Sequence, residues 1–210
     1  MHAELDELLS REHFLCCDRG ALLKALKWWI AEQNPTCLMH PHGFFVLPLK
    51  RQEGEEWRLH LWPSDRADGY GMPGRVHTHD KHVDSRILLG TLTNLQYAVS
   101  EVETGAWPLY EAHYHGDRYL KQTTNLLRKT STRVDLSAGE PARMLAGDSY
   151  RIERHTFHEA VPLPGLTTCT LVCMHSPAPG SIKVVGVDGY PDVLSFERSE
   201  HPGHLFLRHI

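Results

Sequence analysis

The chain has 210 residues and a mass of 23.9 kDa, which is enough for one globular domain with its own core. Apolar residues make up 41% and charged residues 23%, and the net charge is −4 with neutral histidines. This balance excludes a strong positive field, so we expect no nucleic-acid or membrane partner. Histidine is unusually frequent at 16 residues, and it is the commonest metal ligand among side chains.

The N-terminal sequence and the cysteines indicate a cytoplasmic protein. The first residues, MHAELDELLSREHF, are acidic and lack the apolar stretch of a secretory signal. No apolar run approaches the length of a membrane span. The cysteines are odd in number and form no Cys-x-x-Cys pair, so we expect reduced thiols.

Residues 1–40 are predicted to form a helical segment that packs on the rest of the chain. Leucines at 5, 8 and 9 suit a short amphipathic helix. Residues 20–33 place Leu and Trp side chains at helical spacing, and Asn34-Pro35 ends that helix.

Residues 41–210 are predicted to form a mainly β domain. From Phe44 onward, short runs rich in β-branched and aromatic residues are separated by Gly, Pro and charged turns. Many short strands of this kind favour a sandwich or a barrel. The expected strands cover 43–51, 56–62, 85–102, 109–115, 131–136, 149–152, 167–175 and 182–187.

A His-x-His pair, His77-Thr78-His79, is the first feature that points to chemistry. On a strand, residues two apart project to the same face, so the two imidazoles are predicted to lie together inside the β domain. Two protonated rings at that distance would repel each other. One divalent ion removes this repulsion, and it needs a further ligand from elsewhere in the chain.

The further ligand is predicted to be His158. It lies in the segment from Gly147 to Ala160, in which a Gly-Asp turn leads into a strand and His158 follows a short loop. Its ring is expected to meet the rings of His77 and His79 inside the fold.

These two segments resemble the two motifs of the cupin superfamily. The first motif has a Gly, five residues, His-x-His, three or four residues, an acid and a second Gly; the second motif has a Gly and a His. Here the acid is Asp instead of the usual Glu, and the final spacing is one residue short. The resemblance implies an RmlC-like jelly-roll β-barrel with one bound metal ion. The matching residues are Gly71, His77, His79, Asp84, Gly90, Gly147 and His158.

Within the cupins, the chain is most similar to the thiol dioxygenases, of which cysteine dioxygenase is typical. The similarity runs from about Phe44 to Val185 and includes EWRLHLWP, YRIERHTFHEAV and LVCMHSPAPG. It implies Fe(II) held by three histidines, with open positions where substrate and dioxygen bind side by side. The implied activity is that of a non-haem Fe(II) dioxygenase.

Two departures indicate that the substrate is not free cysteine. Asp84 and His175 stand where the animal enzymes have a crosslinked Cys and Tyr. The Arg that grips the amino-acid carboxylate should lie near Leu47, and none is in register, although Lys50 and Arg51 are close.

The role of Asp84 stays open between ligation and structure. As a fourth ligand it would leave fewer open positions, which favours a different oxygenase or another metal such as manganese, nickel or zinc. Alternatively it caps a turn or pairs with Lys81 or Arg86. The predicted metal ligands are therefore His77, His79 and His158, with Asp84 as a further candidate.

Four other side chains are candidates for positioning substrate or moving protons: Arg86, Tyr97, Tyr150 and His175. Arg86 and Tyr97 alternate with apolar neighbours, so they are expected to point into the barrel, where a buried Arg needs an anionic partner. A salt bridge, a core tyrosine and a core histidine are the structural alternatives for these residues.

The functional prediction is a metal-dependent oxygenase, with Fe(II), that acts on a small polar metabolite and dioxygen. The first alternative is a non-redox zinc cupin enzyme, such as an isomerase, lyase or bond-forming synthetase. The second is a cupin that binds a small molecule without catalysis. A homodimer is an additional expectation, because cupins often pair through barrel edges and an edge strand must be covered.

Overall fold

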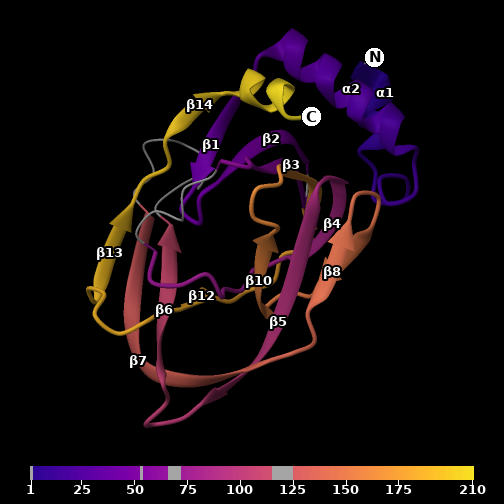
Figure 1. The fold of residues 1–210 in the computed structure, drawn as a ribbon. Coiled ribbons are helices and arrows are strands. Elements are labelled where there is room, and N and C mark those ends of the chain that lie inside the picture. Colours follow the sequence, from indigo (N-terminus) through magenta and orange to yellow (C-terminus); the bar gives the residue numbers. More distant parts are fainter. Residues whose placement is uncertain (1, 53, 66–71, 115–124) are drawn as a thin grey trace.

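The computed structural model describes residues 2–52, 54–65, 72–114 and 125–210, and it shows two antiparallel sheets with helices at one end (Figure 1). The mainly β prediction is confirmed. No ladder within these ranges joins the two sheets into a closed barrel. Sheet A contains, in spatial order, β14 (Glu200–Pro202), β1 (Thr36–His40), β2 (Phe44–Gln52), β3 (Glu55–Trp62), β11 (Thr168–His175), β4 (His82–Leu89) and β9 (Ser149–Ile152).

Sheet B faces sheet A across the interior of the molecule (Figure 1). Two further strands extend it, β13 (Val193–Phe196) on β7 and β8 (Ala142–Leu145) on β5. Its main path contains, in spatial order, β10 (Phe157–Pro162), β5 (Thr91–Glu101), β7 (Asn125–Ala138), β6 (Trp107–Tyr114) and β12 (Ile182–Val185).

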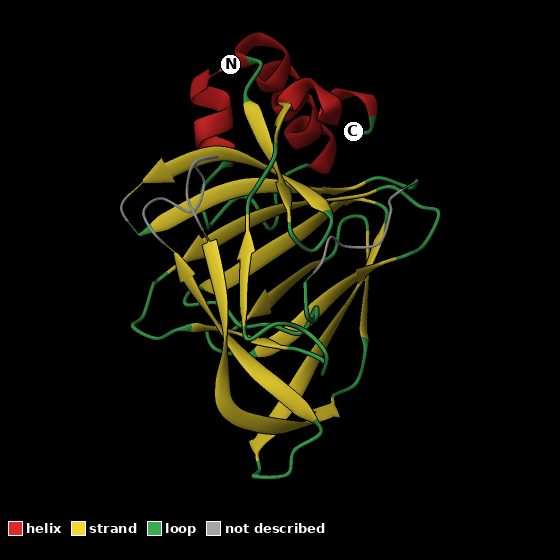
Figure 2. Cartoon of the chain, turned by 90° about the vertical axis from the view of Figure 1, so that its left-hand side faces the viewer, coloured by secondary structure: helices red, strands yellow, loops and turns green. Residues whose placement is uncertain are grey.

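The helices cover the outer face of sheet A. They are α1 (His2–Leu8), α2 (Arg19–Gln33) and the C-terminal 3-10 helix η1 (Gly203–Arg208), which gather at one end of the molecule (Figure 2). At the start of α2, the Asp18 carboxylate accepts a hydrogen bond from the Ala21 N–H at 2.7 Å. Asn34 ends the helix in the left-handed conformation at φ 40°, as the sequence predicts.

The largest core cluster lies between these helices and sheet A. Strand β3 alternates, so Trp57, Leu59 and Leu61 point toward the helices, and the Phe14 ring meets Trp57 edge-on at 4.9 Å between centroids. On the other face of β3, Arg58, His60 and Trp62 point to the interior between the sheets. One strand therefore supplies both the core and one wall of the interior.

The β-rich run predicted over residues 85–102 is divided between two strands. The chain turns at Gly90, which has φ 77°, and β4 and β5 belong to different sheets. A side chain is excluded there because a Cβ on Gly90 would lie 2.4 Å from the carbonyl oxygen of Thr167. The sequence prediction also missed the short strands β1, β8, β10, β13 and β14.

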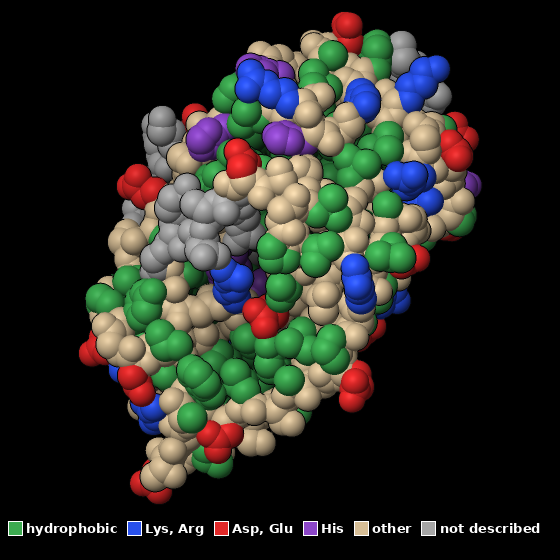
Figure 3. Space-filling model, in the orientation of Figure 1, with side chains coloured by type: hydrophobic (Ala, Val, Ile, Leu, Met, Phe, Trp, Pro, Cys, Tyr) green, Lys and Arg blue, Asp and Glu red, His purple; other side chains and the backbone are tan. Residues whose placement is uncertain are grey.

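The surface mixes charges of both signs on the face shown in Figure 3, and apolar side chains gather over its lower half, where sheet B lies. Among the described residues, no helix combines the length and the apolar character needed to cross a membrane.

Candidate metal centre

The segment that carries His77 and His79 lies between the two outer strands of sheet B. The backbones of His77 and His158 exchange two hydrogen bonds of 3.0 Å, so His77 is bridged to the second residue of β10. On its other side, the Val185 N–H on β12 donates to the Val76 carbonyl at 2.9 Å. The expected regular strand through His77 and His79 is thus an extended segment with single bridges, and His158 lies on a strand where a loop was expected.

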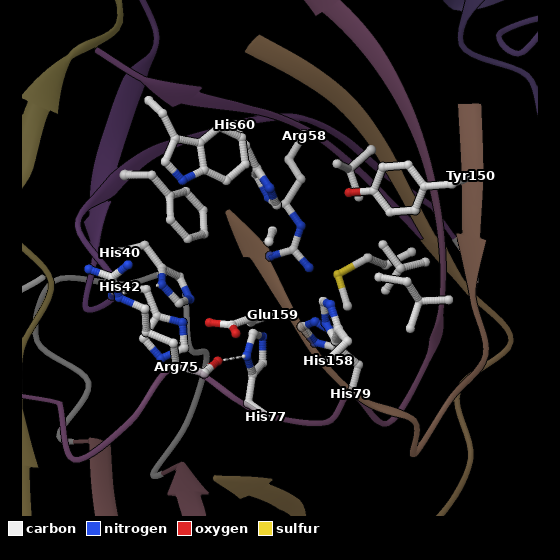
Figure 4. Close-up of a pocket in the computed structure, with 17 residues that line it drawn as sticks. His40, His42, Arg58, His60, Arg75, His77, His79, Tyr150, His158 and Glu159 are labelled. Atoms are coloured by element: carbon white, nitrogen blue, oxygen red, sulfur yellow. Dashed lines mark hydrogen bonds between the residues drawn. The ribbon is translucent and has the colours of Figure 1, made fainter. Parts of the chain in front are cut away.

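The three predicted histidines come together in space. Their nearest ring nitrogens all lie within 4.8 Å of one another. The ring centroids are 4.8 Å apart for His77 and His79, 4.7 Å for His77 and His158, and 5.2 Å for His79 and His158. Figure 4 shows the three side chains side by side at one end of a cavity. They form a three-histidine cluster that can hold a divalent metal ion.

The ring nitrogens of the cluster are in a state that can bind a cation. Nδ1 of His77 lies 2.8 Å from the Arg75 carbonyl, so that nitrogen carries the proton and Nε2 is left with a lone pair. Within the described residues, both ring nitrogens of the buried His158 lack a hydrogen-bond partner. Burial lowers the pKa of His79 and His158, followed by the effect of neighbouring imidazoles. Neutral rings with unsatisfied nitrogens fit a metal ion.

Asp84 does not join the cluster, in contrast to its expected role as a further ligand. On β4 the side chains alternate, and Val83 lines the cavity while Asp84 points to the opposite face of sheet A. There its carboxylate accepts two hydrogen bonds from Arg151, at 2.6 and 2.9 Å, and lies 3.1 Å from Nε2 of His175. Although burial raises the pKa of Asp84, the Arg151 hydrogen bonds and charge lower it overall. Asp84 therefore forms a salt bridge, with Arg151 in place of the expected Lys81 or Arg86.

Arg86 and His175 also lie on that outer face, away from the cavity. The Arg86 guanidinium donates to the Phe14 carbonyl at 2.8 Å, so it ties sheet A to the N-terminal segment. Nδ1 of His175 lies 2.9 Å from the Ser176 hydroxyl. The expectation that Arg86 points into the barrel is therefore not met, because residues of even number on β4 face outward.

The Asp84→Asn variant is expected to lose about 2 kcal/mol of folding free energy while its metal content stays unchanged. The folded state lowers the pKa of Asp84, so this stabilisation is present above the unfolded value near pH 3.9 and is lost as the pH falls through the folded value. Urea denaturation at pH 7 and pH 3 measures the difference, with the exposed Asp65→Asn as control. A loss of metal from Asp84→Asn would contradict this placement.

The two candidate tyrosines lie closer to the histidine cluster. Tyr150 lines the cavity, and burial raises its pKa to about 12, so its hydroxyl stays protonated at neutral pH. Tyr97 donates a short hydrogen bond to Glu159, which lines the cavity beside the cluster. Burial, followed by this carboxylate, raises the pKa of Tyr97. Tyr97 therefore affects the cavity indirectly, because it holds the Glu159 carboxylate in place.

Several residues of the cavity were missed by the sequence analysis. The cavity measures about 740 Å³ including its mouth. His40 and His42 form another His-x-His pair around Pro41, a pattern that favours a loop. The signal that could have found the others is the alternation of β3, which places Arg58, His60 and Trp62 on one face. The missed lining residues are His40, His42, Phe44, Arg58, His60, Trp62, Arg75 and Glu159.

The metal-free protein is expected to lose stability as the pH falls from 7 to 5. Burial, followed by neighbouring positive charges, lowers the pKa of His40 and His60, so the unfolded chain binds their protons first, near pH 6.5. Each group lowers the free energy of unfolding by up to about 1.4 kcal/mol per pH unit below that value. Urea denaturation at pH 7, 6 and 5 measures the slope. His60→Gln should flatten it, and an equal slope in this variant would contradict the assignment.

Comparison with known proteins gives no family for this chain. No protein-family model matches the sequence, and no curated protein matches it significantly. The fold and the histidine cluster are compatible with a cupin.

Proposed function

We propose that this chain is a cupin enzyme with one Fe(II) ion, an oxygenase that acts on a small polar metabolite other than free cysteine. The observation that carries the proposal is the cluster of three imidazoles at the end of a cavity. In this proposal, sheets A and B are the two walls of the cupin jelly roll, and the cavity between them is the active site.

The ligand set supports an oxygenase because it leaves room on the ion. Three neutral histidines keep the full charge of a divalent ion, and Asp84 is held elsewhere by Arg151. An ion held by these three ligands would keep open positions, at which substrate and dioxygen could be held side by side. When bound, Fe(II) supplies the redox chemistry that activates dioxygen.

The residues around the cluster have separate tasks in this proposal. The Arg75 carbonyl fixes the tautomer of His77, so its Nε2 stays available as a ligand atom. Tyr97 holds the Glu159 carboxylate near His77. Burial lowers the pKa of His77, and the negative charge of Glu159 offsets part of that decrease. This carboxylate can accept a proton from the substrate. The Tyr150 hydroxyl stays protonated and can donate a hydrogen bond.

An apolar wall lies beside the cluster and excludes water from the reaction. It comes from the inner faces of β4, β9 and β11, which pack against one another behind the cavity. A dry wall protects a reactive intermediate from side reactions. The residues are Val83, Ile152, Val172 and Met174.

A second candidate is a non-redox zinc enzyme, such as an isomerase, lyase or bond-forming synthetase. Three histidines with an open position are also a common zinc ligand set, in which the ion acts as a Lewis acid. The same cluster favours both candidates, and the metal that the protein retains distinguishes them.

Elemental analysis of protein purified without added metal is expected to show about one iron per chain. Fe(II)-loaded protein is then exposed to nitric oxide under anaerobic conditions, because nitric oxide binds to Fe(II) where dioxygen would. Electron paramagnetic resonance is expected to show the spin-3/2 signal of the iron–nitrosyl adduct. Retention of zinc with no such signal in iron-loaded protein would support the second candidate and contradict the oxygenase.

A further inference from the structure

The cavity in front of the histidine cluster has a positive lining. Arg58 and Arg75 line it, and Arg198 lines an adjoining lobe that shares His40 and Arg58 with it. Among the described lining residues, Glu159 supplies the single carboxylate. Arginines therefore outnumber carboxylates in the described part of the lining, which favours an anionic ligand.

Arg58 is a cation that acts on the cluster from within the cavity. It lies on β3, its side chain is almost fully buried, and its charge is felt by both His79 and His60. Figure 4 shows its guanidinium reaching toward the middle of the cavity, with the three histidines on the far side. A divalent ion at the cluster would place a second cation across the cavity from the buried Arg58. Their repulsion is relieved when an anionic group lies between them.

A column of aromatic rings forms the wall next to Arg58. The rings of His40 and Phe44 are stacked at 4.3 Å and 15°, and those of Phe44 and Trp62 are stacked at 4.7 Å and 30°. His60 lies beside the column, 4.9 Å from Phe44. All three residues of the column line the cavity. Aromatic rings attract a flat conjugated molecule in stacked or edge-to-face arrangements.

His60 adds a polar contact to this wall. Its Nε2 is buried and has no hydrogen-bond partner within the described part of the chain. A buried polar atom without a partner is unfavourable, and a ligand that bonds to it restores the balance. This nitrogen lies on the same inner face of β3 as the Arg58 guanidinium.

We propose that the organic substrate is a flat, conjugated carboxylate. Its carboxylate lies between the metal ion and Arg58, its ring packs against the aromatic column of His40, Phe44 and Trp62, and a polar substituent meets Nε2 of His60. The proposal rests on the proposed function, because the metal ion is one of the two cations that hold the carboxylate. The arginines of the lining disfavour cationic substrates. The aromatic column favours a conjugated substrate over a fully saturated one.

Benzoate is the probe that tests this substrate class, with two matched molecules as comparisons. Isothermal titration of metal-loaded protein is expected to show benzoate binding. Benzamide has the same ring without the charge and should bind at least about 30-fold more weakly. Cyclohexanecarboxylate has the same charge without the conjugated ring and should bind about three- to tenfold more weakly. Equal affinities for all three molecules, or no binding of benzoate, would overturn the proposal.

Variants of Arg58 test its role directly. Arg58→Gln is expected to weaken benzoate binding at least about 30-fold, whereas Arg58→Lys keeps the charge and should recover part of the loss. Arg143→Gln, on an exposed position of β8, is the matched control and should bind benzoate like the wild type. Circular dichroism confirms that each variant is folded. Unchanged benzoate affinity in a folded Arg58→Gln variant would overturn the assignment.

The metal content of each sample separates the two proposals. If the protein binds no metal, the proposed function fails, and so does the inference, since one of its two cations is missing. If the protein binds about one ion per chain and benzoate does not bind, only the substrate class fails. If Arg58→Gln retains its metal and loses benzoate, both proposals are supported.

Discussion

The His158→Ala variant is expected to purify with almost no metal under conditions in which the wild type holds about one ion per chain. His158 is the ligand that comes from β10, so its loss leaves only His77 and His79 from one short segment. Its buried ring has no hydrogen-bond partner among the described residues, so its nitrogens are available to coordinate the ion. We expect the metal affinity to fall by at least about 100-fold, beyond the effect of outer-shell substitutions.

Inductively coupled plasma mass spectrometry and zinc titration of metal-free protein measure this loss. His113→Ala is the control, because His113 is exposed on β6 and lies outside the cluster. The metal-free forms of wild type and His158→Ala are compared by circular dichroism, so that loss of metal is separated from loss of fold. A folded His158→Ala protein with wild-type metal content would contradict the three-histidine centre.

The convergence of the three histidines could be predicted from the sequence, although the local structure could not. The His-x-His spacing puts His77 and His79 on one side of any extended backbone, whether or not a regular ladder forms around it. Single bridges to Val184 and His158 are enough to fix the segment. The prediction that His77 and His79 lie together needs only an extended backbone, so it holds although the expected regular strand is absent.

The position of Asp84 could not be predicted, because it depends on the register of β4. Side chains alternate between faces with a period of two, so a single-residue shift moves every side chain of a strand to the other face. The register is seen only in the pairing of β4 with β11 and β9, which lie far away in the sequence. The outcome places Val83 in the cavity and Asp84 with Arg151.

The histidine and arginine lining of the cavity was within reach of the sequence. In Glu55–Trp62, the larger apolar residues Leu59 and Leu61 alternate with Arg58 and His60. One of the two faces must be the apolar one, and the helices of the N-terminal segment cover it. The polar face then has to line a cavity in which a ligand or other polar groups satisfy Arg58 and His60. The packing of the helices on the apolar face is the tertiary feature that the sequence pattern did not show.

Gly74→Ala is expected to destabilise the protein by about 3 kcal/mol and to weaken metal binding about tenfold or more. A Cβ at this position would lie 1.9 Å from the carbonyl oxygen of Val185, which is too close for any contact. Val185 lies on β12 and its N–H bonds to Val76, three residues before His79. The clash therefore pushes away the strand that fixes the histidine segment, and the ligands lose their alignment.

Thermal unfolding of the metal-free protein and zinc titration measure the two effects separately. Gly20→Ala is the matched control: this glycine is exposed in the first turn of α2, and a Cβ there meets only the Asp18 carboxylate at 3.2 Å. Higher helix propensity should make the control as stable as the wild type or slightly more stable. If Gly74→Ala has the same unfolding temperature and the same zinc affinity as the wild type, β12 does not hold the segment. The cluster is then positioned by β10 alone.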